Sequence, residues 1–304
     1  IAYGGPGATF WMITAGLAGM ATKFSECTLA VKYRQVAEDG SVAGGPPFYL
    51  RQGFADRGWP RLGRGLAAVW AFFCVAGSFG GGNMFQANQS FKLLAGMFPA
   101  LAGHGAAYGA VLALGVGLVI IGGIKGIARV TSKIVPLMAT LYVVTSLVVI
   151  ATHISELPSV FALIVKSAFA PSAMHGGFIG VMVVGLRRAA FSNEAGVGTA
   201  AVAHAAARTH EPVAEGFVAL QEPFVDTVVI CTMTALVLIF TGFHQHGGLD
   251  GAALTAAAFG SVASWLPYLL MVAIVLFSFS TQLSFAYYGV TTFDYLFGGA
   301  AARV

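Results

Sequence analysis

The chain has 304 residues, of which 57% are hydrophobic and 9% are charged, with a formal net charge of +4 at pH 7. Soluble domains carry about 25% charged residues, and so few charges cannot cover a water-facing surface of this size. The composition therefore excludes an ordinary soluble globule and predicts an all-α integral membrane protein surrounded by membrane lipid. A nucleic-acid partner is also excluded, because no basic face is interleaved with aromatic residues.

Seven apolar segments are predicted to cross the bilayer as helices, which need about 20 residues each. They cover residues 7–32, 65–97, 105–124, 132–152, 174–190, 213–242 and 262–290. The segment 156–170 is amphipathic and is predicted to lie on the membrane surface. Residues 1–304 therefore form one transmembrane domain.

Basic residues gather in the first, third and fifth loops and after the last span. They are Lys32, Arg34, Arg51, Arg57, Arg61, Arg64, Lys125, Arg129, Lys133, Arg187, Arg188, Arg208 and Arg303. Because basic loops stay cytoplasmic, the chain is expected to enter from the outer face at residue 1. At least one further span should then precede it, and the domain is expected to be incomplete at both ends.

Two pairs of charged residues lie within apolar segments. Lys23 and Glu26 are three residues apart, on one helix face, which favours a structural ion pair over a proton relay. Glu222 and Asp226 are four residues apart. They are suited to facing a cation, although capping or pairing with loop arginines is favoured narrowly.

The second span contains three consecutive glycines, residues 80–82, followed by amide side chains. On a regular helix Phe79, Asn83 and Gln86 share one face. Amides on such a face suit the polar ends of a small zwitterion, and the ring suits its side chain. Hydrogen bonding between helices explains the amides equally well.

The fifth span is short and flanked by glycines, and the polar run Ser192–Glu194 follows it. Short, glycine-interrupted spans in transporters are often discontinuous helices whose free backbone groups bind ions and substrate. The alternative is an ordinary cytoplasmic loop with arginine anchors. Glu194 is expected to form a structural or gating ion pair with Arg187 or Arg188.

The last span carries a dense run of hydroxyls. Ser278, Thr281 and Phe285 lie near one face, and Ser280 adjoins it. Hydroxyl oxygens are hard ligands that suit Na⁺. Hydroxyls that bond back to the preceding helical turn, which are common in membrane helices, account for the run equally well.

Signatures of catalysis are missing from the sequence. It contains no H-E-x-x-H, P-loop or G-x-S-x-G motif, and no TVGYG-like filter of a potassium channel. The sequence therefore predicts no enzyme.

Several motifs together resemble the alanine/glycine:cation symporter family, the sodium:alanine symporters. The matching segments are Gly4–Ala8, Gly19–Phe24, Gly44–Leu50, Gly82–Met84, Lys133–Pro136, Phe191–Gly196, His204–Ala207, Asp226–Thr227, Ser280–Thr281 and Tyr287–Gly289. The run Phe-Ser-Asn-Glu-Ala-Gly at 191–196 is the most specific of them. The resemblance extends over essentially the whole chain.

This resemblance implies a LeuT-like fold of two inverted five-helix repeats with a site at the membrane midplane. The seven spans would be family helices two to eight, with the first and the last family helices missing. Phe79, Gln86, Thr281 and Phe285 would then line the substrate site, together with Asn83. Ser280 and Thr281 would form half of a sodium site, and Ser192, Asn193, Glu194 and Asp226 would act in gating or structure.

Two positions depart from the family pattern. The family typically has Trp where this chain has Phe285, and Glu where it has Val290. Phe285 lacks the indole N–H and some of the bulk, so a preference for alanine over larger amino acids does not follow from the resemblance.

The resemblance implies Na⁺-coupled symport of a small neutral amino acid, alanine or glycine, across the plasma membrane, which is expected to be a bacterial inner membrane. Two alternatives stay open. One is a proton-coupled transporter, or one for another amino acid, of the same fold. The other is a membrane channel or receptor that binds without coupling.

Overall fold

A computed structural model describes residues 1–38, 40–170, 177–245, 248–249 and 251–298. Within these residues the regular secondary structure is helical apart from one small hairpin, in which β1 (Gln35–Val36) pairs antiparallel with β2 (Val42–Ala43). Four helical rods are both long and apolar enough to cross a membrane: Pro60–Met97, Gly123–Thr152, Pro212–Phe240 and Leu266–Phe297. The molecule is therefore a multi-pass helical membrane protein.

The helices follow one another closely along the chain. Their bounds are α1 Gly7–Lys32, α2 Pro46–Ala55, α3 Pro60–Gly77, η1 Ser78–Met84, α4 Phe85–Met97, η2 Pro99–Leu101, α5 Gly105–Ile120, α6 Gly123–Thr152, η3 Ile154–Glu156, α7 Leu157–Ala168, α8 Gly177–Asn193, α9 Thr199–His204, α10 Pro212–Ala219, α11 Gln221–Pro223, η4 Phe224–Cys231, α12 Thr232–Phe240, η5 Phe243–Gln245, α13 Gly251–Val262 and α14 Leu266–Phe297. The elements η1 and η4 are π-helices that continue their α-helical neighbours, so α3 to α4 and α10 to α12 each form one rod.

Each of the seven predicted spans coincides with a helix, but three of these helices are too short or not apolar enough to count as membrane-crossing helices. Helix α1 has the length and is less apolar, while α5 and α8 are shorter, with 16 and 17 residues. The segments read as loops are more ordered than expected. The first contains the hairpin and α2, and 243–261 contains α13.

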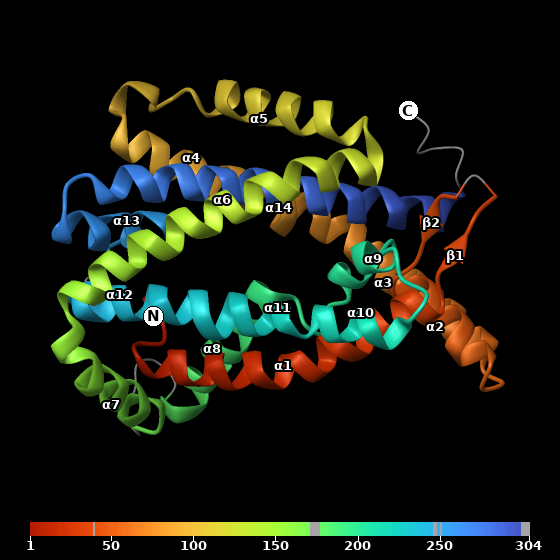
Figure 1. Cartoon of the computed structure of the whole chain (residues 1–304), viewed down its shortest axis with the longest axis horizontal. Coiled ribbons are helices and arrows are strands. Elements are labelled where there is room, and N and C mark those ends of the chain that lie inside the picture. The colour runs from red at the N-terminus through yellow and green to blue at the C-terminus, as the bar shows by residue number, and fades with distance from the viewer. Residues whose placement is uncertain (39, 171–176, 246–247, 250, 299–304) are drawn as a thin grey trace.

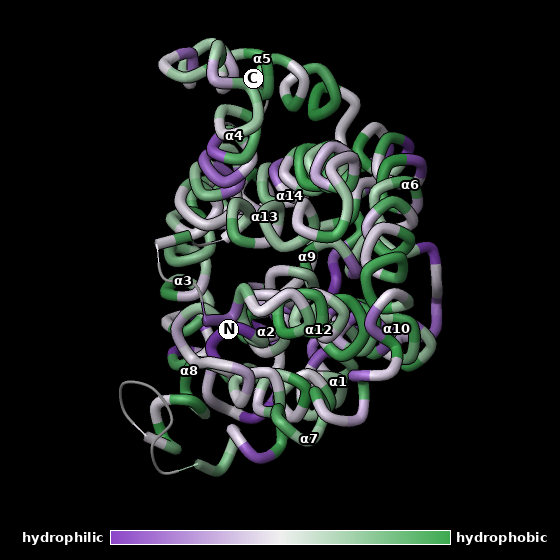
Figure 2. Tube along the Cα trace, turned by 90° about the vertical axis from the view of Figure 1, so that its left-hand side faces the viewer, coloured by the Kyte–Doolittle hydropathy of each residue, from purple (hydrophilic) through white to green (hydrophobic). Residues whose placement is uncertain are grey.

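The rods pack in layers (Figure 1). Helices α4 and α5 lie on one side, α6, α13 and α14 lie in the middle, and α1 with the α10–α12 rod follows, with α7 and α8 on the far side. The end-on view in Figure 2 shows the same order, with hydrophobic residues along the outer rods α5 and α6. Helix α7 turns one stripe inward, with Val160, Ile164 and Ala168 buried, as its amphipathic pattern predicts.

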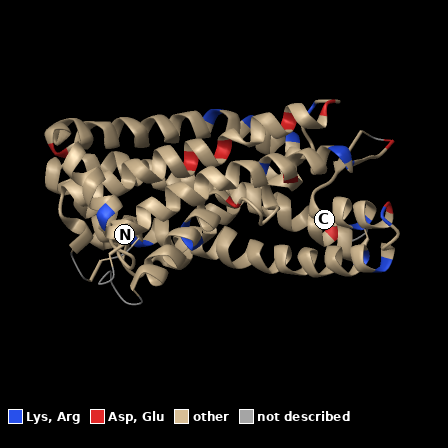
Figure 3. Ribbon diagram, turned by 90° about the horizontal axis from the view of Figure 1, so that it is seen from below, with Lys and Arg blue, Asp and Glu red and all other residues tan. Residues whose placement is uncertain are grey.

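The basic loops meet at one end of the rods. Arg51 of α2, Lys125 of α6 and Arg208 after α9 border one cavity of about 1920 Å³, although they come from three different loops. Figure 3 shows Lys and Arg gathered toward the end that carries α2 and the hairpin. This arrangement agrees with the predicted alternation for the basic residues that line this cavity, whereas Arg187 and Arg188, predicted in the fifth loop, lie within α8.

Close backbone approach joins α8 to α1. A Cβ atom added at Gly185 would lie 2.6 Å from the carbonyl oxygen of Ala8 and 2.6 Å from Cβ of Trp11. The two helices therefore pack at a distance that only glycine permits, as small residues do at membrane helix interfaces.

We expect Gly185→Ala to destabilise the protein by about 1–3 kcal/mol, because the new methyl group overpacks against a backbone carbonyl. Gly117→Ala in α5 is the matched control, since a Cβ there meets nothing within 4 Å. Thermal unfolding of both variants in detergent measures the difference. Equal melting temperatures would contradict the tight α1–α8 contact.

Candidate functional site

A cavity of about 780 Å³ lies among α1, α3, α4, α8, α12 and α14. Ligand pockets typically occupy about 300–1,000 Å³ and combine apolar walls with a few polar groups. The aromatic wall consists of Trp70, Phe73, Phe191 and Phe285. The polar lining includes Gln86, Arg188, Ser192, Glu194, Thr199 and Thr281. The cavity thus has the make-up of a site for a small polar solute.

Five residues singled out in the sequence meet at this cavity. They are Gln86 of α4, Ser192 of α8, Glu194 of the following loop, and Thr281 and Phe285 of α14. Phe79, Asn83, Asn193, Asp226 and Ser280 do not line it. Trp70 and Thr199 do line it, and sequence reasoning missed both.

The π-helix η1 explains why Phe79, Asn83 and Gln86 do not share a face. Hydrogen bonds from residue i to i+5 change the helical repeat, so the spacing of a regular α-helix does not apply. Phe79 is 68% exposed, and the Asn83 amide donates to the Ser78 carbonyl at 2.6 Å. Contact of Phe79 and Asn83 with a substrate stays a prediction.

Phe285 packs directly onto the backbone of η1. A Cβ atom added at Gly82 would lie 2.1 Å from Cγ of Phe285. The glycine run predicted to allow close approach therefore admits the aromatic ring of α14, which in turn forms one wall of the cavity.

The two hydroxyls predicted to bind sodium point to different places. Ser280 is buried, donates to the Phe277 carbonyl at 3.2 Å, and contacts Sδ of Met138 on α6 at 3.7 Å. Thr281 lines the cavity, and its hydroxyl makes no hydrogen bond within the part of the chain that the structure describes. The sodium role of both residues stays a prediction, and the geometry favours Thr281.

The fifth predicted span is a discontinuous helix, as its glycines and short length indicate. Helix α8 ends at Asn193, the next residue Glu194 has φ = 54°, and α9 begins at Thr199 after Gly198 with φ = 88°. A left-handed conformation is costly for a residue with a side chain. The surrounding polar contacts therefore have to hold this break in place.

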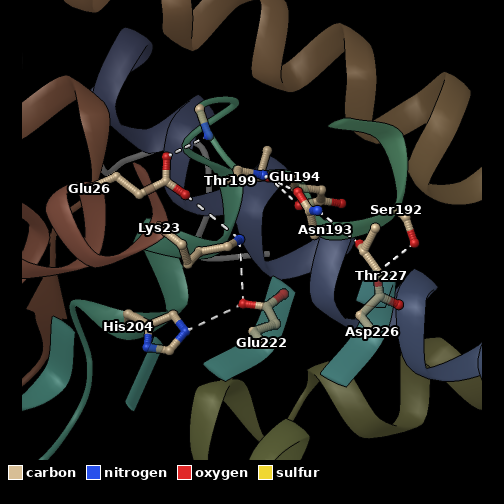
Figure 4. A network of polar contacts seen from close by, with 12 residues as sticks. Lys23, Glu26, Ser192, Asn193, Glu194, Thr199, His204, Glu222, Asp226 and Thr227 are labelled. Carbon is tan, nitrogen blue, oxygen red and sulfur yellow. Dashed lines mark hydrogen bonds and ion pairs between the residues drawn. The ribbon is translucent and has the colours of Figure 1, made fainter. Parts of the chain in front are cut away.

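Side chains at the end of α8 anchor the break to η4. Ser192 donates to Oδ2 of Asp226 at 2.5 Å, and the Asn193 amide donates to Oγ1 of Thr227 at 2.8 Å (Figure 4). Oδ1 of Asn193 also accepts from the Ala195 amide at 3.0 Å. These contacts satisfy polar groups that would otherwise be unpaired at membrane depth.

The predicted ion pair of Glu194 with Arg187 or Arg188 does not form among the described residues. Glu194 instead accepts a hydrogen bond from the Thr199 hydroxyl. Helix α8 extends to Asn193, so both arginines lie within it and not in the loop, while the left-handed turn directs Glu194 toward α9.

The predicted Lys23–Glu26 ion pair is confirmed, and it belongs to a larger network (Figure 4). Nζ of Lys23, which is fully buried, lies 3.7 Å from Glu26 and 3.3 Å from Glu222 of α11. Oε2 of Glu26 accepts from the Gly196 amide at 3.1 Å. The network therefore ties α1 both to α11 and to the helix break.

The expectation that Glu222 and Asp226 cap a helix or pair with loop arginines is wrong. Glu222 pairs with Lys23 and approaches Nε2 of His204 at 4.0 Å, and Asp226 accepts from Ser192 and Thr227. His204 also meets Glu215 of α10 at 2.5 Å. Segments that are far apart in sequence supply these partners, so spacing alone did not reveal them.

A further contact anchors the C-terminal end of α9, which is predicted to face the cytoplasm. Arg34 donates to the carbonyl oxygens of Ala205, Ala207 and Thr209 at 2.6–3.0 Å. These are carbonyls at and beyond the C-terminus of a helix, where a cation is favourable.

These features define a multi-pass membrane protein with a cavity of aromatic walls and a few polar groups beside a discontinuous helix. The model of the sodium:alanine symporter family matches residues 1–304. The chain belongs to this family, which is one of transporters and not of catalytic enzymes.

Individual relatives agree with the family match. Sodium/alanine symporter AgcS of Methanococcus maripaludis is 41% identical over 99% of this chain and 66% of its own length. Probable sodium/glutamine symporter GlnT of Bacillus subtilis is 38% identical over 97% of this chain and 60% of its own length. Amino-acid carrier protein AlsT, also of Bacillus subtilis, is 37% identical over 97% of this chain and 61% of its own length. The chain spans about two thirds or less of the length of these curated relatives.

We expect Lys23→Met to destabilise the protein by about 3–5 kcal/mol, because it leaves the buried Glu26 without its cation. Lys92→Met is the matched control, since Lys92 is exposed on α4. The triple change Lys23→Met, Glu26→Gln and Glu222→Gln should recover much of the loss. Unfolding in detergent or denaturant measures all three, and a Lys23→Met variant as stable as Lys92→Met would refute the network.

Proposed function

We propose that the protein is a Na⁺-coupled symporter that carries a small neutral amino acid, alanine or glycine, across the plasma membrane. The observation that carries this proposal is the convergence of Gln86, Thr281 and Phe285 with the helix break after α8 at one cavity. Family membership supports it. The chain spans only part of the length of its relatives, so the activity of the whole protein is inferred from this part.

The cavity supports a zwitterionic substrate. The Gln86 amide and the Thr281 hydroxyl offer hydrogen bonds to polar ends, while the Phe285 ring covers a short side chain. Since Phe285 is smaller than the Trp that the family resemblance predicts there, a somewhat larger amino acid stays the alternative within the same fold. The relative described as a glutamine symporter is consistent with that alternative.

Sodium would bind at hard oxygen atoms beside the substrate. The Thr281 hydroxyl, which faces the cavity without a hydrogen-bond partner among the described residues, is the ligand we assign first. Ser280 would join it only after turning away from Met138 and the Phe277 carbonyl. Na⁺ travels here as a co-substrate, down its gradient.

The fold we propose is LeuT-like, with the described helices as family helices two to eight. The discontinuous helix α8–α9 supports this assignment, because broken helices line the midplane sites of such transporters. Ser192, Asn193 and Asp226 would hold the α8 side of the break, and Glu194 with Thr199 the α9 side. Movement of one bundle against the other would then alternate access to the cavity.

We expect the full-length protein in proteoliposomes to accumulate labelled alanine only when an inward Na⁺ gradient is present. Replacing external Na⁺ by K⁺ or choline should abolish accumulation. Uptake that persists unchanged would refute sodium coupling and make H⁺ the next candidate. Binding without accumulation against a gradient would indicate a channel or receptor instead.

We expect Thr281→Ala to raise the Na⁺ concentration needed for half-maximal uptake by about tenfold, because one hydrogen bond or ligand oxygen to a charged group is lost. The concentration of Na⁺ that gives half-maximal uptake is the measurement. Ser284→Ala is the control, because that hydroxyl bonds back to the Ser280 carbonyl at 3.2 Å and the residue does not line the cavity. An unchanged Na⁺ requirement in Thr281→Ala would remove this residue from the ion site.

A further inference from the structure

Trp70 of α3 forms a direct contact between that helix and the break in the discontinuous helix. Its indole Nε1–H donates to the carbonyl oxygen of Val197 at 2.7 Å. Val197 lies in the irregular loop between α8 and α9, where backbone groups at membrane depth need protein partners. One side chain of α3 therefore holds the segment that separates the two half-helices.

The start of α9 packs tightly around the same indole ring. A Cβ atom added at Gly198, which has φ = 88°, would lie 2.5 Å from Cγ of Pro46 and 3.4 Å from Nε1 of Trp70. The contact continues along α9, since a Cβ atom added at Gly45 would lie 2.9 Å from Cγ2 of Val202. The glycine-proline turn before α2 and Trp70 thus form a close-fitting seat for the start of α9.

The contact between Trp70 and Val197 lies at one end of the cavity. Among the described residues of α3 that line the cavity, Trp70 is the nearest to the start of this helix at Pro60. Val197 and Thr199 line the cavity from the break and from the start of α9. Beyond Trp70, α3 leads back to α2 and the hairpin, toward which Lys and Arg gather (Figure 3). We call this end of the cavity its basic end.

A neutral hydrogen bond has the strength that a reversible contact needs. One such bond shifts an equilibrium between two arrangements by about two- to tenfold. The bond joins α3 to the break, which belong to different helical rods. Movement of one bundle against the other would therefore break this bond at modest cost and form it again on return.

We propose that Trp70 is a positioning residue whose hydrogen bond to Val197 keeps the cavity closed at its basic end. The bond opens when the cavity becomes accessible from that end. This inference rests on the proposed function, to which it adds a residue that controls access from one side. Trp59 provides a matched control, because it is 62% exposed just before α3 and does not line the cavity.

Two native thiols report on access to the cavity. Cys74 lies one turn after Trp70 on α3, is buried and lines the cavity. Cys27 of α1 is fully buried and does not line it. Opening of the basic end therefore exposes Cys74 to a reagent from that side, whereas general loosening of the protein exposes both thiols.

The first experiment labels the full-length protein in inside-out membrane vesicles with a membrane-impermeant maleimide, and mass spectrometry reports the rate at each cysteine. We expect Trp70→Phe, which keeps an aromatic ring and removes the N–H, to label Cys74 about two- to tenfold faster than wild type. Cys27 should keep its wild-type rate, and Trp59→Phe should change neither. A wild-type rate at Cys74 in Trp70→Phe would overturn the proposal, and so would a parallel rise at Cys27.

The second experiment repeats the labelling in right-side-out vesicles, where the reagent meets the opposite face. We expect no faster labelling of Cys74 in Trp70→Phe from this face, because the lost bond lies at the basic end. An increase of equal size from both faces would contradict closure at one end.

These measurements need no transport, so they separate the two proposals. If the wild-type protein fails to accumulate alanine while Trp70→Phe still exposes Cys74 from the basic end, the proposed symport is refuted and the closing contact stands. If alanine accumulates and the substitution leaves the labelling unchanged, the closing contact is refuted and the symport stands.

Discussion

The buried ammonium group of Lys23 is the interaction on which the arrangement around the cavity depends. A fully buried charge is costly unless opposite charges lie beside it, and Nζ of Lys23 has carboxylates at 3.3 and 3.7 Å. One of these carboxylates, Glu26, also accepts the Gly196 amide. The same cation therefore fixes α1, α11 and the loop that interrupts the helix. Since removing one partner leaves a buried unpaired charge, the three segments hold their positions together.

The irregular backbone around the cavity follows from the membrane environment. In lipid every backbone polar group needs a partner, so non-helical segments are tolerated only where protein covers them or a cavity faces them. The π-helices η1 and η4 and the break at 194–198 all border the same cavity, through Gly81, Cys231 and Glu194. Gly82 lets Phe285 pack against η1, so this irregular segment shapes one wall of the cavity.

How far the sequence predicts this structure depends on how local each signal is. The long apolar segments predict the membrane helices. The spacing of three residues predicts the Lys23–Glu26 pair. The short, glycine-flanked apolar segment before Ser192 predicts the discontinuous helix. The prediction that Phe79, Asn83 and Gln86 share one helix face was wrong because η1 departs from the α-helical repeat. Glu222 was misjudged because its partner Lys23 comes from a distant segment, and Thr199 was missed because only the left-handed turn at Glu194 brings that carboxylate to its hydroxyl. Local pattern thus identified the elements, while long-range packing decided which side chains reach the cavity.

The two halves of the discontinuous helix are anchored by different partners, and this difference bears on how the site works. The end of α8 is bonded to η4 through Ser192 and Asn193, whereas α9 is held by Arg34 at its end and by the contact of His204 with Glu215. Ser192 near the end of α8 and Thr199 at the start of α9 both line the cavity. A solute that contacts both side chains would therefore connect the two halves. Since a ligand shifts a conformational equilibrium only through contacts that differ between its states, a substrate held on both sides of the break is able to favour one placement of the two halves over another.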